Sequence, residues 1–375
     1  MNPIMLYYRM MSKRVVILIS HWTEGGAQQA ALRLTRGLIK RGHDAELWAL
    51  YQRRATDTKD TPVHLVHTAG EPGPGGYLSL LSKTAAALRR HGPDAVISFL
   101  PLASIVGQAA ARWAGIQRRI ASHRVRADTY HPLMRWGDWL CGNLGFYTDT
   151  IAVSEAVRQS VPGFPAGYRR RMRVVHNGLD SHPSARSKAD ARSQFKLPEH
   201  AKLLLAVGRL ATQKNYSLLL DAVAPCPDLH LVIAGDGPLR PALEGQAKSL
   251  GLDKRLHLLG HVHSDRMPDL YRACDAFALA SLFEGQSNAL LEALREGMVI
   301  FASDIPEQTE TLVDEHGVAA GILLPVDDAK AWTDAFKTVL GDEVKEAAYR
   351  AKAKQRAKAF SLDAMLNGFE AGFAD

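Results

Sequence analysis

Two basic residues in the second half of the chain have a spacing that could bind an anion. Arg209 directly follows the apolar run 203–208, and Lys214 comes five residues later, next to Asn215, which we expect to cap the following helix. The amino end of a helix carries a partial positive charge, so two uncompensated cations there suggest a bound anionic ligand such as a diphosphate. The alternative is that both side chains are solvated surface cations.

A second polar segment follows the apolar run 276–281 and opens another predicted helix. Ser287 is the expected cap of that helix, and Gly285 lets a ligand approach the backbone closely. The amides of residues 286–288 would then face the same anion. The complete segment is Glu284, Gly285, Gln286, Ser287 and Asn288.

Two glutamates of this region could hold hydroxyl groups of a ligand. Glu284 lies in the loop and Glu292 lies on the helix, eight residues further along the chain. A pair of glycosidase carboxylates is a competing interpretation, but eight helical residues rise about 12 Å. Glycosidase carboxylates are separated by roughly 5 to 9.5 Å, so the spacing disfavours hydrolysis. A role in helix solubility alone is the other alternative.

Weaker candidates for ligand contacts lie in the first half of the chain. Gly25 and Gly26 follow the first apolar run and expose backbone N–H groups at the start of a helix. Phosphate can bind there, although a tight turn explains the two glycines equally well. His123 closes the apolar run 118–122 and could be a base or polar contact for an acceptor, or a structural histidine. The chain contains no Asp-x-Asp pair, so we expect no metal cofactor.

The elements that must position these residues alternate between short apolar runs and helix-like segments, which is the pattern of a parallel α/β sheet. In the first half the runs cover residues 15–20, 45–50, 95–100, 118–122 and 150–154. In the second half they cover residues 202–208, 229–235, 256–260, 276–281, 298–303 and 321–326. Ligands bind at the carboxyl ends of such strands, so the candidate residues follow the runs where a site is expected.

A polar segment at 176–190, with an Asn-Gly turn and a proline, interrupts this alternation and marks a linker. We therefore predict two Rossmann-like domains, at 12–180 and 181–358, and a helix at 359–375 that could return to the first domain.

Residues 1–10 lack the features of a signal peptide, and we expect them to be a leader from an upstream start codon. No apolar run is long enough to span a membrane, and three scattered cysteines favour a reducing compartment.

The charge of the chain is distributed unevenly. Residues 1–180 hold 24 Lys and Arg against 12 Asp and Glu, whereas the rest of the chain holds 22 against 27. The asymmetry favours an anionic partner of the first domain, although solubility alone could explain it. Such a partner could be nucleic acid, a membrane surface or a phosphorylated substrate. No nucleic-acid-binding motif accompanies the charge, so we expect no nucleic acid. We expect an anionic membrane surface, because an acceptor carried on a lipid diphosphate lies there. The arginines expected to form this basic face are Arg89, Arg90, Arg118, Arg119, Arg124, Arg126, Arg169, Arg170, Arg171 and Arg173.

Several motifs of the chain resemble, in the same order, those of the retaining glycosyltransferase family 4. The similar segments are GGAQ at 25–28, IAVSEAV at 151–157, HNGLD at 176–180, the stretch 207–223, LVIAGDGPLRPALE at 231–244 and EGQSNALLEAL at 284–294. The resemblance implies the GT-B architecture, in which two Rossmann-like parallel-sheet domains face each other across a cleft. The first domain would bind the acceptor and the second the nucleotide-sugar donor.

The resemblance also implies roles for the candidate residues of the second domain. Arg209 and Lys214 would bind the donor diphosphate. Glu284 would contact the hydroxyl groups of the donor sugar, and Glu292 would hold the ribose. Transfer would retain the anomeric configuration by attack from the front face, with the leaving phosphate helping to take the acceptor proton and no protein nucleophile.

Two positions depart from the family pattern, of which the first would alter sugar preference and the second would affect packing. Gln286 stands where the family most often has an aromatic residue, and Val299 replaces the usual proline. The form EGQSN is nearer to a variant that we associate with UDP-hexosamine and UDP-hexose donors. In the segment RIASHR, His123 takes the position of a family glutamate. The turn at Gly25 and Gly26 would pack over the diphosphate when the domains close.

The sequence thus predicts a cytoplasmic retaining glycosyltransferase, peripheral on the inner face of the membrane. It would move a hexose or hexosamine from a UDP-linked sugar to a glycan or lipid-linked acceptor in bacterial surface polysaccharide synthesis. A GT-B epimerase or hydrolase acting on nucleotide-sugars, and a non-catalytic partner subunit, are the alternatives. The expected catalytic residues are Glu284 and His123. The expected donor-binding residues are Gly25, Gly26, Arg209, Lys214, Gly285, Gln286, Ser287, Asn288 and Glu292.

Overall fold

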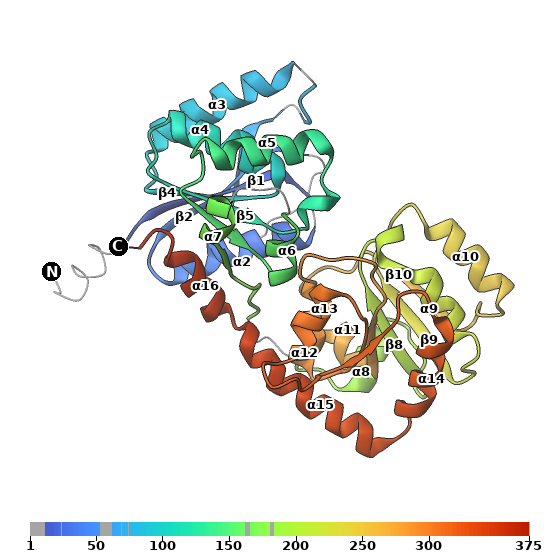
Figure 1. The fold of residues 1–375 in the computed structure, drawn as a ribbon. Helices are drawn as coiled ribbons and strands as arrows, with labels where there is room; N and C mark the ends of the chain where they lie inside the picture. The colour runs from blue at the N-terminus through green and yellow to red at the C-terminus, as the bar shows by residue number, and fades with distance from the viewer. Residues whose placement is uncertain are drawn as a thin grey trace. The chain divides into compact units, whose positions relative to one another are not determined.

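The computed structural model of the protein describes residues 12–23, 25–52, 62–68, 70–73, 75–161, 166–180 and 184–374. The chain forms two compact units (Figure 1). The first unit consists of the chain up to Leu179 together with Ser361–Asp375, and the second unit is Asp180–Phe360. The expected leader at residues 1–10 lies outside the described residues.

The described part of the first unit contains a seven-stranded sheet in the order β3-β2-β1-β4-β5-β6-β7, with all neighbouring strands parallel. Its strands are β1 (Arg14–Trp22), β2 (Asp44–Gln52), β3 (Val63–His67), β4 (Ala95–Phe99), β5 (Arg118–His123), β6 (Asp149–Ala152) and β7 (Met172–Val174). Its helices are α2 (Gly26–Lys40), α3 (Gly76–His91), η1 (Ala103–Gly107), α4 (Gln108–Trp113), η2 (Ala127–Thr129), α5 (Pro132–Asn143), α6 (Glu155–Gln159), α7 (Ala166–Arg171) and α16 (Leu362–Glu370).

The described part of the second unit contains a six-stranded parallel sheet in the order β10-β9-β8-β11-β12-β13. Its strands are β8 (Lys202–Val207), β9 (Leu229–Ala234), β10 (Leu256–Gly260), β11 (Ala276–Leu279), β12 (Val299–Ser303) and β13 (Ile322–Leu324). Its helices are α8 (Lys188–Gln194), η3 (Thr212–Lys214), α9 (Tyr216–Val223), α10 (Arg240–Ser249), α11 (Met267–Ala273), α12 (Asn288–Glu296), α13 (Pro306–Leu312), α14 (Ala329–Val339), α15 (Glu343–Ala357) and η4 (Lys358–Phe360). The strand order reverses between β8 and β11, and parallel sheets bind ligands at such a switch point.

Each predicted apolar run coincides with a strand, which confirms the α/β fold class with two parallel sheets. Two strands of the first sheet lack such a run. β3 is an edge strand whose side chains are mostly half-buried, and β7 is an edge strand of three residues with Arg173 in its middle. Edge strands face solvent along one side, so their sequences need not be continuously apolar.

The central runs are continuous because both faces of each sheet are covered. In β1, Val15, Ile17 and Ile19 belong to one core cluster, whereas Val16 and Leu18 belong to another. All five side chains are fully buried. Successive residues of a strand point to opposite faces, so a strand with helices on both sides carries apolar residues at every position.

The C-terminal helix α16 packs against α2 of the first unit. Leu366 lies so close to Gly37 that a Cβ atom at Gly37 would come within 2.6 Å of the leucine Cδ2. Arg41 donates hydrogen bonds to Asp363 (2.8 Å) and to Glu370 (2.6 Å). Close packing and paired charges thus join α16 to α2, across the whole sequence of the second unit.

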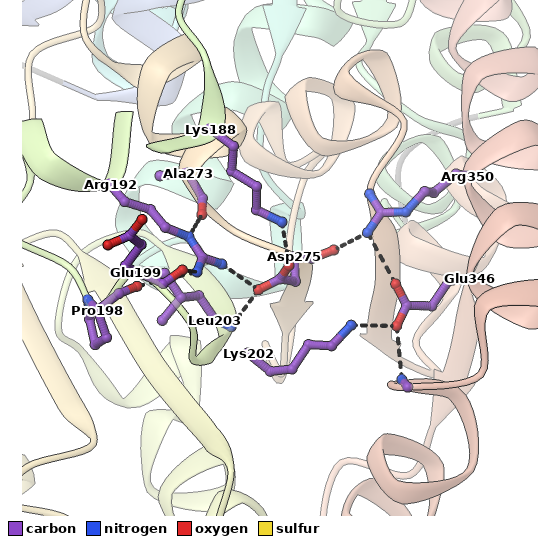
Figure 2. Close-up of polar contacts among 11 residues, drawn as sticks. Lys188, Arg192, Pro198, Glu199, Lys202, Leu203, Ala273, Asp275, Glu346 and Arg350 are labelled. Atoms are coloured by element: carbon purple, nitrogen blue, oxygen red, sulfur yellow. Dashed lines mark hydrogen bonds and ion pairs between the residues drawn. The ribbon is translucent and has the colours of Figure 1, made fainter. Parts of the chain in front are cut away.

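Asp275, directly before β11, is the centre of a polar network in the second unit (Figure 2). Its carboxylate accepts hydrogen bonds from Lys188 and from Arg192 (2.8 Å), both on α8. Arg350 of α15 donates to the Asp275 carbonyl (2.7 Å) and contacts Glu346 on its own helix (3.4 Å). The network joins α8, β11 and α15 at the amino end of β11, away from the edge where the candidate residues lie.

Candidate functional site

Two of the candidate residues meet at the switch point of the second unit. β8 and β11 are adjacent parallel strands, so the loops after their carboxyl ends begin at the same edge of the sheet. Lys214 follows β8 and Glu284 follows β11. Their side chains form an ion pair with an Nζ–Oε1 distance of 2.6 Å, and only 15% and 10% of the two side chains are exposed. A pair this shielded from solvent is little weakened by salt.

Hydrogen bonds hold the two loops together beside this ion pair. The Leu282 N–H donates to the Gln213 carbonyl (2.9 Å), and the Gln213 side-chain amide donates to the Phe283 carbonyl (2.8 Å). Gln213 directly precedes Lys214, and Phe283 directly precedes Glu284. The bonds therefore restrict the relative positions of the two charges.

The ion pair corrects the expectation that the cations near this helix lack compensation. Lys214 is paired with Glu284, and it is not a solvated surface cation. Asn215 occupies the expected N-cap position with φ of 51°, but its side chain donates to the Val326 carbonyl (2.9 Å) and does not cap the helix. Arg209 is exposed, and its side chain forms no hydrogen bond or ion pair with any described residue, so its charge is available to a ligand.

Two residues that the sequence analysis did not select shape the surroundings of Lys214. Gly208 has φ of 148°, and a Cβ atom there would lie 2.7 Å from the Lys214 Cε. Tyr216 donates a hydrogen bond to the Gly208 carbonyl (2.9 Å). Burial, and then the charge of Glu284, raise the pKa of the Tyr216 hydroxyl, so it remains protonated and able to donate. A glycine directly after a central strand is the sequence signal that could have identified this close approach.

The segment after β11 is buried at its start and begins a capped helix. The predicted N-cap is confirmed, because the Ser287 hydroxyl accepts a hydrogen bond from the Leu290 N–H (3.4 Å). Glu284, Gly285 and Gln286 are buried like Ser287, whereas Asn288 is half-buried. The first turn of α12 contains no acidic residue, so its partial positive charge is not neutralised within the helix.

Glu292 is held by a tyrosine from a neighbouring helix. The Tyr271 hydroxyl of α11 lies 2.9 Å from Glu292 Oε2 and 3.2 Å from the Ala289 carbonyl, and it donates to both oxygens. Burial, and then the charge of Glu292, raise the pKa of Tyr271, so this donor also stays protonated. No hydrogen bond joins Glu292 to Glu284 in the described structure. Sequence reasoning missed Tyr271 because the contact depends on how α11 packs beside α12.

The remaining candidates lie in the first unit. Gly25 is the N-cap residue of α2, in an extended conformation without a side-chain cap, and Gly26 begins the helix. His123 ends β5 and is only 3% exposed. Its Nε2 lies 2.9 Å from the Tyr168 hydroxyl, and its Nδ1 lies 3.9 Å from Asp138 Oδ2. Both ring nitrogens face protein groups, which fits a structural histidine better than a base.

Several further properties concern the whole described chain. Among the residues that the structure describes, no three His, Cys, Asp or Glu side chains lie close enough together to hold a metal ion. None of the described helices combines the length and apolar character that a membrane-spanning segment requires. Cys141, Cys226 and Cys274 are buried and form no disulfide.

Two parallel Rossmann-like sheets in one chain define the class of protein as the GT-B fold, and solved structures share this fold. The crystal structure of Anabaena HepE in complex with UDP and glucose matches with a TM-score of 0.82 at 21% identity, over 96% of this chain and 98% of that chain. WaaG, a glycosyltransferase involved in lipopolysaccharide biosynthesis, matches with a TM-score of 0.74 at 16% identity, over 96% and 99%. At these identities the likeness shows the fold alone.

The family follows from the sequence of each unit. Residues 24–182 match Glycosyltransferase Family 4, and residues 187–359 match Glycosyl transferases group 1. The chain therefore belongs to the family 4 glycosyltransferases of the GT-B fold.

Two curated relatives are similar over part of the chain. The Campylobacter jejuni N-acetylgalactosamine-N,N'-diacetylbacillosaminyl-diphospho-undecaprenol 4-alpha-N-acetylgalactosaminyltransferase is 40% identical over 161 residues, or 42% of this chain and 43% of that protein. The Rhizobium meliloti lipopolysaccharide core biosynthesis glycosyltransferase LpsE is 27% identical over 240 residues, or 59% of this chain and 68% of that protein. The chain thus spans less than half the length of the Campylobacter relative.

Proposed function

We propose that the protein is a retaining glycosyltransferase that moves a hexose or hexosamine from a UDP-linked sugar to a glycan or lipid-linked acceptor in bacterial surface polysaccharide synthesis. The observation that carries the proposal is the buried Lys214–Glu284 ion pair at the switch point of the second unit. The family of both units supports transferase activity. The names of the relatives support the substrates, since one acts on a diphospho-undecaprenol-linked glycan and HepE was crystallised with UDP and glucose.

The donor would be held by groups of both charges. Lys214 and the exposed Arg209 supply cations for the diphosphate. Hydrogen bonds between such cations and phosphate oxygens are charge-assisted and therefore stronger than hydrogen bonds between neutral groups. Lys214 bonds only one oxygen of Glu284, which leaves Oε2 to accept a hydrogen bond from a sugar hydroxyl. Tyr271 occupies Oε2 of Glu292, so Oε1 would accept from a ribose hydroxyl.

The transfer step needs no protein nucleophile. The bond between the sugar C1 and the diphosphate oxygen breaks, and the bond between C1 and the acceptor oxygen forms on the same face of the sugar. The acceptor proton passes to the departing diphosphate oxygen, and the cations of Lys214 and Arg209 stabilise the negative charge that develops there. The ion pair fixes Lys214 before the donor arrives, so less reorganisation is needed during the reaction.

The test is to incubate the protein with UDP-N-acetylgalactosamine, UDP-N-acetylglucosamine, UDP-glucose and GDP-mannose, with and without a diphospho-undecaprenol-linked glycan. We expect UDP release that requires the acceptor, and a product with the anomeric configuration of the donor by NMR. UDP release without acceptor would indicate the hydrolase alternative, and an epimerised donor the epimerase alternative. Calorimetry that shows neither UDP nor UDP-sugar binding would indicate a non-catalytic subunit.

A further inference from the structure

Helix α5 of the first unit carries an exposed apolar stripe. Leu133, Trp136 and Leu144 are 63%, 58% and 54% exposed. These positions, with the half-buried Leu140, recur at the three- and four-residue spacing that places side chains on one side of a helix. The opposite side, which includes Asp138, is buried against the rest of the unit. Leu133 and Trp136 of α5, and Leu144 at its C-cap position, therefore present apolar side chains to solvent.

A second exposed tryptophan lies beside the end of this stripe. Trp113 ends α4 and is 57% exposed. The preceding Arg112 donates hydrogen bonds to the carbonyls of Leu144 (3.3 Å) and Gly145 (2.9 Å), which places the ends of α4 and α5 together (Figure 1). Arg89 of α3 donates to the Trp113 carbonyl (2.6 Å). Arg89, Arg112 and Trp113 thus lie beside the carboxyl end of α5, where Leu144 is exposed.

The sequence between α3 and η2 has an excess of arginine, although two of its arginines, Arg119 and Arg124, are buried. The chain has five arginines and no Asp or Glu between Asp94 and Asp128. Asp128 is paired with Arg126 (2.6 Å), and Asp138 is fully buried. Exposed apolar side chains next to cations complement a membrane, which has anionic headgroups at its surface and an apolar interior.

The structure also changes the membership of the predicted basic face. Arg119 is buried and donates to backbone carbonyls, including that of Ile116 (2.6 Å). Arg124 is buried with its guanidinium over the Phe99 ring. Arg173 is paired with Asp149. Arg119 and Arg124 serve the interior of the unit, so the predicted face is wrong for these two residues, whereas Arg173 is half-buried.

We propose that Trp113, Leu133, Trp136 and Leu144, with Arg89 and Arg112, form a surface that docks on an anionic membrane. We name it the α4–α5 surface. Tryptophan favours the boundary between headgroups and acyl chains, and arginine is attracted to anionic lipid. A second copy of the chain is disfavoured as the occupant, because pairing the surface with itself would bring like charges together. The proposal rests on the proposed function, because a protein docked on the membrane would lie close to a lipid-linked acceptor. Docking itself does not require the nucleotide-sugar donor, so it can be tested separately.

The experiment measures binding of the full chain to vesicles by sedimentation, with neutral vesicles and vesicles containing about 30% anionic lipid, at low and high salt. The wild-type protein is expected to bind anionic vesicles at low salt and to be released as salt rises. A double variant that combines Leu133→Ser and Trp136→Ser is expected to bind anionic vesicles about tenfold more weakly, or weaker still. Lipids brominated in the acyl chain should quench the tryptophan emission of the wild type more than that of the double variant.

The control is Val344→Ser, which removes an apolar side chain of the second unit that is 80% exposed, more than Leu133 or Trp136. It should bind vesicles like the wild type, and all three proteins should melt at the same temperature. Three results would overturn the proposal. They are equal binding of the wild type and the double variant, equal binding to neutral and anionic vesicles, and no binding to anionic vesicles at low salt. A concentration-dependent dimer that the double variant loses would also overturn it, in favour of a second copy. UDP binding by calorimetry should be the same in every variant, so a failure of docking is distinct from a failure of the proposed function.

Discussion

The Lys214 ammonium and the Glu284 carboxylate lie 2.6 Å apart, although 70 positions separate the two residues in the chain. They meet because β8 and β11 are neighbours at the point where the strand order reverses. The pair joins a cation suited to a diphosphate with a carboxylate suited to sugar hydroxyls. Binding and orientation of the two parts of a nucleotide-sugar would therefore be coupled through one contact.

Replacing Lys214 by alanine should reduce both transfer and stability. Transfer is expected to fall about 10- to 100-fold, because a charge-assisted hydrogen bond to the diphosphate is lost. The free energy of unfolding is expected to fall by about 1–3 kcal/mol, because Glu284 would remain buried without its partner. Steady-state kinetics and urea denaturation measure the two effects.

Arg209→Ala is the matched control, since Arg209 is exposed and its side chain has no partner among the described residues. It should lower transfer within the same range of about 10- to 100-fold while leaving the free energy of unfolding unchanged. If both alanine variants transfer sugar at the wild-type rate, the diphosphate binds elsewhere.

Glu284→Gln and Glu292→Gln should separate contacts with the sugar from contacts with the ribose. Glu284→Gln is expected to lower kcat/KM with UDP affinity nearly unchanged, and Glu292→Gln to weaken UDP about tenfold. Tyr271→Phe should weaken UDP by a smaller factor, because it frees the Glu292 carboxylate to move without removing it. Calorimetry with UDP would contradict these roles if Glu284→Gln, and not Glu292→Gln, lost the nucleotide.

Chelation should leave transfer intact. The chain has no Asp-x-Asp pair, and the positive charges of Lys214 and Arg209 are expected to act on the diphosphate in place of a metal ion. The measurement is the initial rate of UDP release after dialysis against EDTA, with Mg²⁺ or Mn²⁺ then added back. If EDTA inhibited transfer completely and added Mg²⁺ or Mn²⁺ restored it, the prediction of metal-independent transfer would be contradicted.

Glu346 should make a pH-dependent contribution to stability (Figure 2). Burial alone would raise its pKa, but hydrogen bonds from the Gly341 N–H (2.8 Å) and the Lys202 side chain (2.9 Å) outweigh burial and lower it. A carboxyl with a lowered pKa in the folded state stabilises the fold above its unfolded-state pKa and loses this effect as pH falls through the folded-state pKa. Glu346→Gln should therefore lower the free energy of unfolding at neutral pH by about 0.5–1 kcal/mol, since solvent partly screens the contacts.

The pH dependence is checked by urea denaturation of the wild type and Glu346→Gln at neutral pH and at about pH 3, well below the usual range of glutamate. The difference between them should become smaller at the lower pH, because the contribution is lost as pH falls through the lowered folded-state pKa of Glu346. Glu343→Gln removes an exposed charge from the same first turn of α15 and should change stability less at neutral pH. A difference for Glu346→Gln that persists or grows in acid would contradict the assignment.

His123 and Tyr168 test whether the buried cluster of the first unit is structural or catalytic. Tyr168→Phe removes the hydroxyl that lies 2.9 Å from His123 Nε2 and should lower the free energy of unfolding by about 1 kcal/mol. His123→Gln should do the same and reduce kcat less than Lys214→Ala does, if the histidine is structural. A kcat loss of about 1000-fold in His123→Gln at unchanged stability would instead support a catalytic base.

Local sequence was sufficient for the central strands of both sheets and for some of the site. Continuous apolar runs such as those of β1 and β8 identify buried parallel strands, because each residue is covered on one face or the other. The Ser287 cap was also predictable, since a cap depends on residues within one helical turn. Arg209 is exposed after its strand as expected, and its assignment to the diphosphate stays a prediction.

Only the tertiary structure decided which of these residues meet. No local pattern specifies that β8 lies beside β11, so the pairing of Lys214 with Glu284 could not be read from the sequence, and Lys214 looked uncompensated. The contact of Tyr271 with Glu292 likewise depends on packing between helices. The apolar stripe of α5 could be recognised as exposed only once the opposite side of the helix was seen to be buried. Side-chain partners distant in sequence are fixed by strand order and helix packing, which depend on the whole chain and not on any local segment of it.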